Sequence, residues 1–149
     1  MADRSQYEEL ARQISAIGAV KRELARHLPV ECPSGSAAVL ALLGRYGEMR
    51  MSRLAELLAV NMSVTSRHVA LVADRGWIER APDPDDRRSR ILRLTPEGQG
   101  MLDELSRRTT DLFAHSLRDW SDDDVGRLNV LLARLRDSLG DCRSASRPA

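Results

Sequence analysis

The chain has 149 residues, of which 42% are hydrophobic and 30% charged, so it can build the core of one domain with helical extensions and is not disordered by composition. Its net charge of +1 argues against indiscriminate binding to nucleic acid or to an anionic membrane. Residues 45–95 carry ten arginines against seven acids, whereas residues 96–149 carry eight against ten, so the middle of the chain is its basic part.

The first third of the sequence predicts two helices. Apolar residues at helical spacing predict one continuous helix from about residue 5 to residue 28. The segment VECPSGS interrupts the pattern, and either Ser34 or Ser36 can cap a second helix that the following glycines end at about residue 47. The apolar positions of the first helix are Leu10, Ile14, Ile17, Val20, Leu24 and Leu28.

A helix-turn-helix pattern follows. Leucines around residues 54–58 predict a short helix, and residues 59–61 predict a tight break. Asn61 is a good N-cap for a further helix over residues 62–74, which Gly76 ends. Two helices joined by three or four residues, the second properly capped, form this motif. The residues of the second helix that we expect to face inward are Val69 and Val72.

The periodicity changes after this motif. Residues 77–80 and 91–94 predict two strands, and the Pro- and Asp-rich residues 81–89 predict a long charged turn between them. A hairpin directly after a helix-turn-helix is a wing. The two motifs together are more specific than either one alone.

Two long helices complete the pattern. The segment TPEG at residues 95–98, with Thr95 as the expected N-cap, is typical of a helix start, and an apolar stripe continues this helix to about residue 119. Ser121 caps the last helix, and Asp124 closes a capping box with it. Apolar residues then line one face as far as Leu139.

Three segments resemble the MarR family of regulators, over residues from about 5 to 140. DPDDRRSRILRLTPEG is similar to the family's wing and the signature after it, SRHVALVADRGWIER to its recognition helix and first wing strand, and MSRLAELLAV to the preceding helix. The resemblance implies a dimeric winged-helix transcription regulator; many such regulators release DNA when a small molecule binds or a cysteine oxidises. The chain departs from the family pattern at Arg50, Ala59 and Met62, where a capping Thr or Ser, a Gly and a Pro are usual.

The predicted fold is therefore mainly α with a small β-hairpin wing, a winged helix-turn-helix with N- and C-terminal dimerisation helices. The apolar stripes of the flanking helices are too long for the winged helix alone to cover. Left exposed they would form a large apolar patch, which usually marks an interface, so we expect a two-fold homodimer. The predicted parts are an N-terminal dimerisation helix (1–33), a DNA-binding domain (34–95), C-terminal dimerisation helices (96–140) and a disordered tail (141–149).

Residues at the start of a recognition helix reach base edges in the major groove. Arg67 can pair bidentately with guanine, and the serine and threonine hydroxyls can bond phosphates or bases. The alternative is an ordinary solvated helix. The candidates are Ser63, Val64, Thr65, Ser66, Arg67 and His68.

The wing carries a second set of candidates. The resemblance implies that the arginine of an Asp-x-Arg motif, here Asp86 and Arg88, enters the minor groove while the aspartate orients it. Positions i and i+2 of an extended strand point the same way, so the carboxylate can hold the guanidinium in a forked pair. Arg87 and Arg90 are candidates for phosphate contacts. The alternative is a solvated charged turn.

Other chemistry has little support in the sequence. Cys32 and His27 could supply two zinc ligands with His115 from a partner, but the spacing has low specificity. Redox sensing by Cys32 would need a lowered pKa and exposure. No Gly-rich phosphate loop or calcium loop is present, so we expect neither an enzyme nor a cofactor.

The sequence thus predicts a sequence-specific transcription regulator, a repressor that binds a palindromic operator of double-stranded DNA as a homodimer. A small-molecule effector of unknown identity is a further candidate partner. The charged start of the chain and the lack of an apolar run of ~20 residues predict a cytoplasmic protein without membrane contact. Two alternatives stay open: a winged-helix protein-interaction module, which the near-neutral charge would suit, and a metal-sensing regulator.

Overall fold

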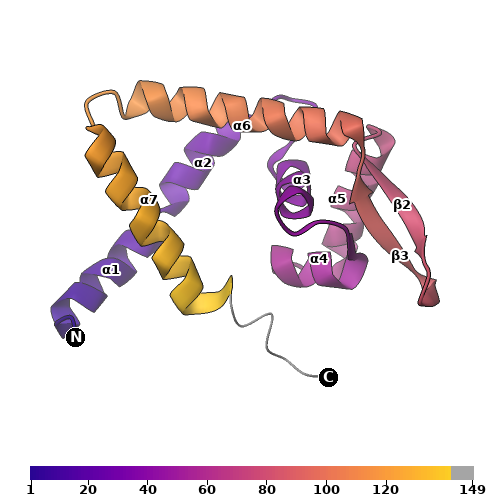
Figure 1. The fold of residues 1–149 in the computed structure, drawn as a ribbon, viewed down its shortest axis with the longest axis horizontal. Helices are drawn as coiled ribbons and strands as arrows, with labels where there is room; N and C mark the ends of the chain where they lie inside the picture. Colours follow the sequence, from indigo (N-terminus) through magenta and orange to yellow (C-terminus); the bar gives the residue numbers. More distant parts are fainter. Residues whose placement is uncertain (142–149) are drawn as a thin grey trace. The chain divides into compact units, whose positions relative to one another are not determined.

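The computed structural model describes residues 1–141, in two compact units that divide between Thr110 and Asp111. Apart from the backbone of residue 141, the predicted disordered tail lies outside the described residues. The described part is mainly helical with one small antiparallel sheet, which confirms the predicted fold class. In chain order (Figure 1) the elements are α1 (Arg4–Ala16), α2 (Gly18–Arg26), α3 (Ser34–Tyr46), β1 (Met49–Arg50), α4 (Met51–Leu58), α5 (Met62–Asp74), β2 (Ile78–Asp83), β3 (Asp86–Leu94), α6 (Pro96–Ser116) and α7 (Asp122–Arg136), followed by a π-helical turn (Asp137–Asp141).

The first predicted helix is divided into α1 and α2. Asp3 caps α1 by accepting a hydrogen bond from the Arg4 N–H at 2.8 Å. The break falls at Ile17, whose backbone stays near helical values (φ −62°, ψ −17°). Gly18 begins α2, and glycine disfavours a helix interior. The prediction of one continuous helix is therefore wrong at this point.

The core of the first unit lies between α3, α4, α5, the sheet and the start of α6. Val69 and Val72 of α5 are fully buried, as predicted from their spacing. Burial of each such side chain stabilises the fold by roughly 1.5–3 kcal/mol. The buried apolar residues are Cys32, Val39, Leu40, Leu43, Met49, Leu54, Val69, Val72, Trp77, Ile78, Leu92 and Leu105.

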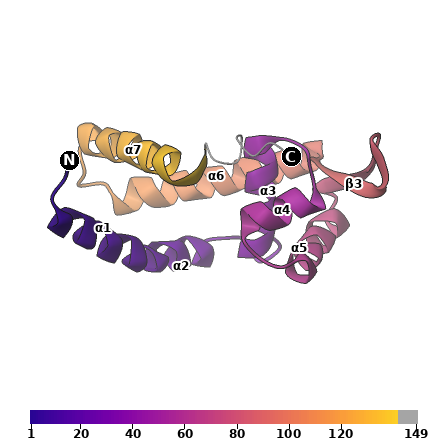
Figure 2. The same ribbon diagram turned by 90° about the horizontal axis from the view of Figure 1, so that it is seen from below.

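The helix-turn-helix is formed by α4 and α5, which pack against each other (Figure 2). Ala59 ends α4 in the left-handed conformation (φ 54°, ψ 37°). Asn61 then caps α5, as predicted: its Oδ1 accepts a hydrogen bond from the Val64 N–H at 2.9 Å. Gly76, with φ 75°, follows the end of α5 and turns the chain into β2.

The sheet has the strand order β1-β3-β2. The predicted long turn over residues 81–89 is wrong, because β2 runs to Asp83 and β3 begins at Asp86, which leaves Pro84 and Asp85 as the turn. Pro82 lacks an N–H but is tolerated because β2 is an edge strand and the register shifts beside it. The two-residue strand β1 was not predicted; it pairs with β3 through Met49↔Leu92 and Arg50↔Ile91.

The start of α6 joins the wing to the recognition helix. Thr95 Oγ1 accepts a hydrogen bond from the Gly98 N–H at 3.1 Å and donates one to the Gly76 carbonyl at 2.5 Å. A Cβ on Gly98 would lie 1.8 Å from the Trp77 carbonyl oxygen, so only glycine allows this approach. The segment TPEG therefore does more than start a helix: it fixes α6 to the end of α5.

The second unit contains the end of α6 and all of α7. Ser121 caps α7 by accepting a hydrogen bond from the Asp124 N–H at 3.1 Å, as predicted. Three acids in the first turn of α7 suit the positive end of the helix dipole. No helix among the described residues is long and apolar enough to cross a membrane.

Candidate nucleic-acid interface

The first turns of α5 present several of the predicted contacts to solvent. Ser63, Ser66 and Arg67 are exposed, whereas Val64 and His68 are partly buried. The N-terminus of α5 also presents backbone N–H groups and the positive end of its dipole, which attract a phosphate. This end of α5 therefore offers one guanidinium and two hydroxyls to a ligand.

Thr65 does not belong to this surface. Its side chain is fully buried, and its Oγ1 donates a hydrogen bond to the Asn61 carbonyl at 3.0 Å. The prediction that Thr65 contacts DNA is therefore wrong for this conformation. The spacing already contained the signal, because Thr65, Val69 and Val72 stand at positions i, i+4 and i+7, which share one face of a helix.

His68 is held between two helices. A Cβ on Gly35 would lie 2.2 Å from the His68 ring, so the imidazole packs directly against the first turn of α3. Gly35 makes this contact sterically feasible. The ring is thus restrained, and its reach towards a base is more limited than that of Arg67.

The tip of the wing exposes the guanidinium groups of Arg87, Arg88 and Arg90. Among the residues that the structure describes, no carboxylate forms an ion pair with any of the three. Their charge is therefore available to an external anion. Arginine forks match phosphate geometry, and such contacts dominate affinity for nucleic acid.

Asp86 organises the backbone under these arginines. Its Oδ1 accepts a hydrogen bond from the Arg88 N–H at 3.0 Å, and its Oδ2 accepts one from the Ser89 hydroxyl at 2.9 Å. The bond from Arg88, followed by that from Ser89, lowers the pKa of the Asp86 carboxyl. The expected forked pair with the Arg88 guanidinium is not the arrangement found, because Asp86 directly follows the turn and its carboxylate caps the backbone two and three residues ahead.

A second carboxylate of the wing, Asp83, was missed as a partner in the sequence. Its side chain is only 2% exposed, and its Oδ2 lies 2.5 Å from Nη2 of Arg50. Its Oδ1 accepts a hydrogen bond from the Asp85 N–H at 2.9 Å. No capping hydrogen bond comes from the Arg50 side chain, so this arginine does not replace the capping Thr or Ser that is usual in the family.

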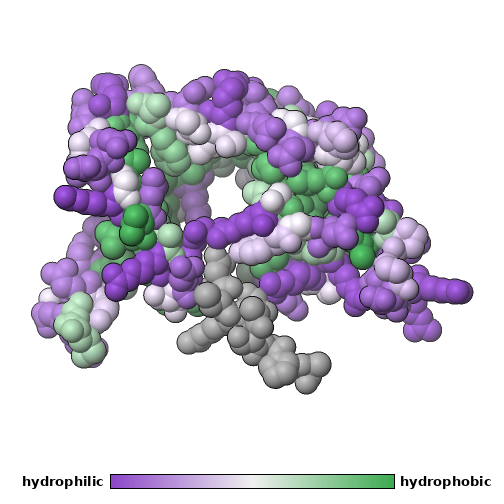
Figure 3. Space-filling view, in the orientation of Figure 1, coloured by the Kyte–Doolittle hydropathy of each residue, from purple (hydrophilic) through white to green (hydrophobic). Residues whose placement is uncertain are grey.

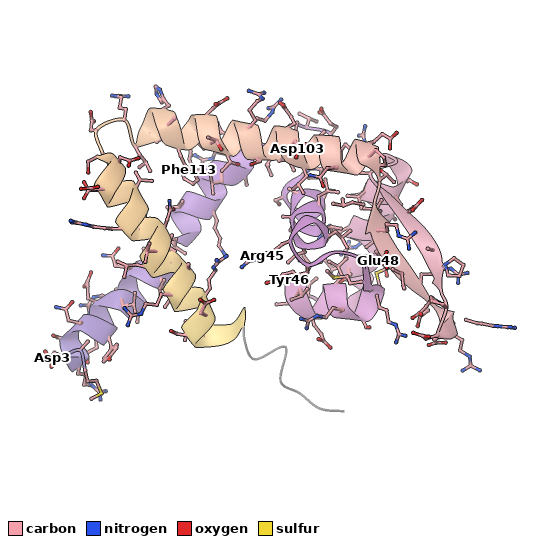
Figure 4. The ribbon with its side chains drawn as sticks, viewed as in Figure 1. Asp3, Arg45, Tyr46, Glu48, Asp103 and Phe113 are labelled. Atoms are coloured by element: carbon pink, nitrogen blue, oxygen red, sulfur yellow. The ribbon has the colours of Figure 1, made fainter. Side chains whose placement is uncertain are left out.

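Arg93 stands apart from the other arginines of this segment. Its Nε donates a hydrogen bond to Glu48 at 2.7 Å, and its Nη1 lies 3.6 Å from Glu79. The bond to Glu48 raises the pKa of Arg93. Glu48 precedes β1, at the base of the hairpin (Figure 4). Arg93 is therefore part of the wing's attachment rather than of its exposed tip.

The structure gives little support to sensing by metal or redox chemistry. Cys32 is fully buried, and burial, followed by the charge of Glu31, raises the pKa of its thiol. Thiolate chemistry needs the opposite shift. Within residues 1–141 no group of three or more His, Cys, Asp or Glu residues is placed to hold a metal ion.

A helix-turn-helix with a basic wing is the arrangement of a winged-helix DNA reader, and comparison with known proteins agrees. The family model described as MarR family matches residues 33–89, from the loop before α3 into β3. This match and the curated relatives support a MarR-family winged-helix regulator of transcription that binds DNA.

Two relatives illustrate the similarity in sequence. The multiple antibiotic resistance protein MarR of Salmonella typhimurium (strain LT2) is 27% identical over 108 residues, which cover 72% of this chain and 75% of the relative. The HTH-type transcriptional repressor IacR of Pseudomonas putida is 28% identical over 94 residues, 63% of this chain and 56% of the relative.

Solved structures share the fold. Wild-type MarR of E. coli in its apo form has a TM-score of 0.74 at 25% identity, covering 85% of this chain and 95% of that one. A mutant MarR of E. coli complexed with operator DNA has a TM-score of 0.66 at 24% identity, covering 90% and 99%. The winged-helix architecture is therefore that of MarR regulators.

Proposed function

We propose that the chain is a repressor that binds a palindromic operator as a homodimer and responds to a small-molecule effector. The observation that carries the DNA-binding part is the exposure of Arg67 on α5 and of Arg88 on the wing tip, within one compact unit. Arg67 and the hydroxyls of Ser63 and Ser66 would read base edges in the major groove. Arg88 would enter the minor groove, where negative potential concentrates.

The other predicted contact residues would add to this DNA-binding surface. Arg87 and Arg90 flank Arg88 on the tip and would contact phosphates. Val64 and His68 are partly buried beside the exposed face of α5, so they would touch the edge of the groove rather than its floor. Asp86 would act through the backbone that it caps.

Exposed apolar side chains support a dimer built from the terminal helices. On α1, Leu10 and Ile14 are 42% and 45% exposed. On α7, Val130 and Leu131 are 67% and 59% exposed, and hydrophobic side chains interrupt its hydrophilic surface (Figure 3). Apolar faces of this kind usually mark an interface, and a second copy offers the same face through two-fold symmetry.

The dimer predicts the form of the operator. Two recognition helices related by a two-fold axis would meet the major groove one DNA turn apart, about 10–10.5 base pairs, on a palindrome. The terminal segments 1–33 and 96–140 would form the interface and residues 34–95 would read DNA. The name of the Pseudomonas putida relative as a repressor supports the same role here, and the site of action would be the cytoplasm.

Selection of bound fragments from a random DNA pool, followed by affinity measurements on the selected duplex, tests the proposal. Arg67→Ala should weaken binding by roughly 1–3 kcal/mol and relax base preference at one position. Arg88→Ala should weaken binding and reduce the slope of affinity against salt by about one. Arg75→Ala, at the exposed C-terminal end of α5 and away from its first turns, is the control and should bind like the wild type.

The same measurements separate the alternatives. If both Arg67→Ala and Arg88→Ala bind like the wild type, the surface is assigned wrongly. A wild-type protein that shows neither heparin retention nor a salt-dependent shift on duplex DNA would be a protein-interaction module instead. Affinity that is unchanged by added zinc or by a chelator removes a metal-sensing regulator.

A further inference from the structure

A buried carboxylate lies at the outer end of β2. The Asp83 side chain is 2% exposed, and a buried charge is costly unless it is paired and hydrogen-bonded. One oxygen is satisfied locally by the Asp85 N–H at 2.9 Å. The other, Oδ2, meets the Arg50 guanidinium at 2.5 Å without an aligned hydrogen bond, so its partner is a charge brought from elsewhere in the chain.

Arg50 brings that charge from the far side of the sheet. It belongs to β1, which pairs with β3, while Asp83 belongs to β2 on the opposite edge of β3. Arg50 is also the N-cap residue of α4, the first helix of the helix-turn-helix. The ion pair therefore joins the outer end of the hairpin to the start of α4, and α4 packs against α5.

The base of the hairpin is held in the core by Ile78 and Leu92, whereas its outer end extends beyond β1. Only the two residues of β1 pair with β3 on that edge, and a two-stranded hairpin is marginal by itself in water. The other ion pair that attaches β3, between Arg93 and Glu48, lies at its base and is exposed, where such pairs contribute little. The pair at the tip, in which the carboxylate of Asp83 is buried and Arg50 is half-exposed, lies next to the arginines that face outward.

We propose that Arg50 is a positioning residue for DNA binding: its ion pair with Asp83 holds the wing tip, so that Arg87, Arg88 and Arg90 are fixed relative to α5. The effect on DNA binding rests on the proposed function, whereas the restraint of the wing tip by the ion pair does not. The hydrogen bonds from Arg88 and Ser89 lower the pKa of Asp86, and the positive charge of Arg50 adds a smaller lowering.

The proposal differs from a direct contact between Arg50 and a phosphate. Arg50 is 48% exposed and would contribute a positive charge to DNA binding in either case. The two readings differ in what Asp83→Asn does. A phosphate contact predicts stronger binding when the competing carboxylate is neutralised, whereas a positioning role predicts weaker binding.

The test uses the full chain and a double-mutant cycle of Arg50→Met, Asp83→Asn and their combination. Asn keeps an oxygen that can accept the Asp85 N–H, so the turn itself is preserved. If the freed wing occupies its binding position one-tenth of the time, affinity for the selected duplex falls about tenfold. Each single variant should show a loss of this order, and the double variant should be no worse than the more damaged single one.

Amide hydrogen exchange of residues 87–90 in the free protein tests, without DNA, whether the ion pair restrains the wing tip. Exchange should accelerate in both single variants. Arg53→Met is the matched control, because it also removes one positive charge near the start of α4 but breaks an exposed ion pair with Glu56. It should leave exchange at residues 87–90 unchanged. Thermal unfolding followed by circular dichroism identifies a variant that fails to fold, and Arg50→Gln, which removes the charge but keeps a polar side chain, then replaces Arg50→Met.

Asp83→Asn that binds the duplex as tightly as the wild type or more tightly, or unchanged exchange in both variants, would overturn the proposal. Failure of the wild type to select any duplex would refute the proposed function instead. In that case faster exchange at residues 87–90 in the single variants would still support restraint of the wing tip by the ion pair, and unchanged exchange would reject it.

Discussion

The Asp86 carboxylate binds the main chain of Arg88: its Oδ1 accepts a hydrogen bond from the Arg88 N–H at 3.0 Å. The guanidinium is left free to meet an anion, while the backbone from which it projects is fixed. Proximity of opposite charges in a sequence therefore need not mean that they neutralise each other. Here the carboxylate sets the shape of the loop and the arginine keeps its charge.

We expect Asp86→Ala to weaken binding to the selected duplex even though it removes a negative charge. The variant loses the hydrogen bonds from Arg88 and from Ser89, each with a net value of about 0.5–1.5 kcal/mol in a typical protein. Fluorescence anisotropy of a labelled duplex measures the effect. Asp86→Asn, which retains acceptor capacity, should lose less affinity; stronger binding by Asp86→Ala would mean that the aspartate only repels DNA.

Gly98→Ala should destabilise the protein by about 1–3 kcal/mol or more, as overpacking commonly does. The added Cβ would lie 1.8 Å from the Trp77 carbonyl oxygen, a backbone atom that cannot turn aside. Urea unfolding at fixed protein concentration measures the change. Gly100→Ala is the matched control, because no atom lies within 4 Å of its Cβ position, and it should stabilise α6 by roughly 0.5–1 kcal/mol. Equal effects of the two substitutions would contradict the close approach at residue 98.

Ala59→Gly should raise the melting temperature. Ala59 has φ 54°, and the left-handed conformation costs an L-residue about 1–2 kcal/mol. The greater freedom of glycine in the unfolded chain offsets roughly 0.4–1 kcal/mol of the gain. Differential scanning calorimetry measures the result. Ala41→Gly, at an exposed position inside α3, should instead destabilise by about 1 kcal/mol, and a lower melting temperature for Ala59→Gly would refute the strain at the turn.

The carboxyl of Glu104 should titrate far below its ordinary range. Hydrogen bonds from Arg107 and Arg108 lower its pKa to about 2, with Nη2 of Arg107 at 2.7 Å and Nε of Arg108 at 2.9 Å from Oε1. Because the folded pKa is depressed, the stabilising contribution is present above the ordinary value of 4.5 and is lost as the pH falls from there towards about 2.

Carbon NMR of the side-chain carboxyl measures this titration. Arg107→Ala or Arg108→Ala should move the midpoint upward, whereas Arg26→Ala on α2 should not. A midpoint near 4.5 in the wild type would show that the two arginines do not hold the carboxylate in solution.

Local signals in the sequence predicted much of the fold. Asn61, Thr95 and Ser121 were expected to cap helices, and each accepts the capping hydrogen bond. The inward positions of Val69 and Val72 followed from helical spacing. Caps and periodicity are set by neighbours within one or two turns, so they can be read without knowledge of the tertiary structure.

Features that depend on distant pairing were not predicted. The strand β1 has only two residues and exists because Met49 meets Leu92 across the sheet. The partner of Asp83 is Arg50, 33 positions earlier in the sequence, and only the strand register brings them together. The length of the turn was also misjudged, because Pro82 and the acids around it suggested a loop, whereas their place on an edge strand allows them to pair.

The burial of Cys32 has a practical consequence. A thiol that no reagent can reach in the native state reacts only when the core around it opens. In a Cys142→Ser background, the rate at which a thiol reagent labels Cys32 would therefore report how often the segment before α3 separates from the helices beneath it. Measured with and without DNA, the same rate would show whether DNA bound at the wing and α5 changes how often the core around Cys32 opens.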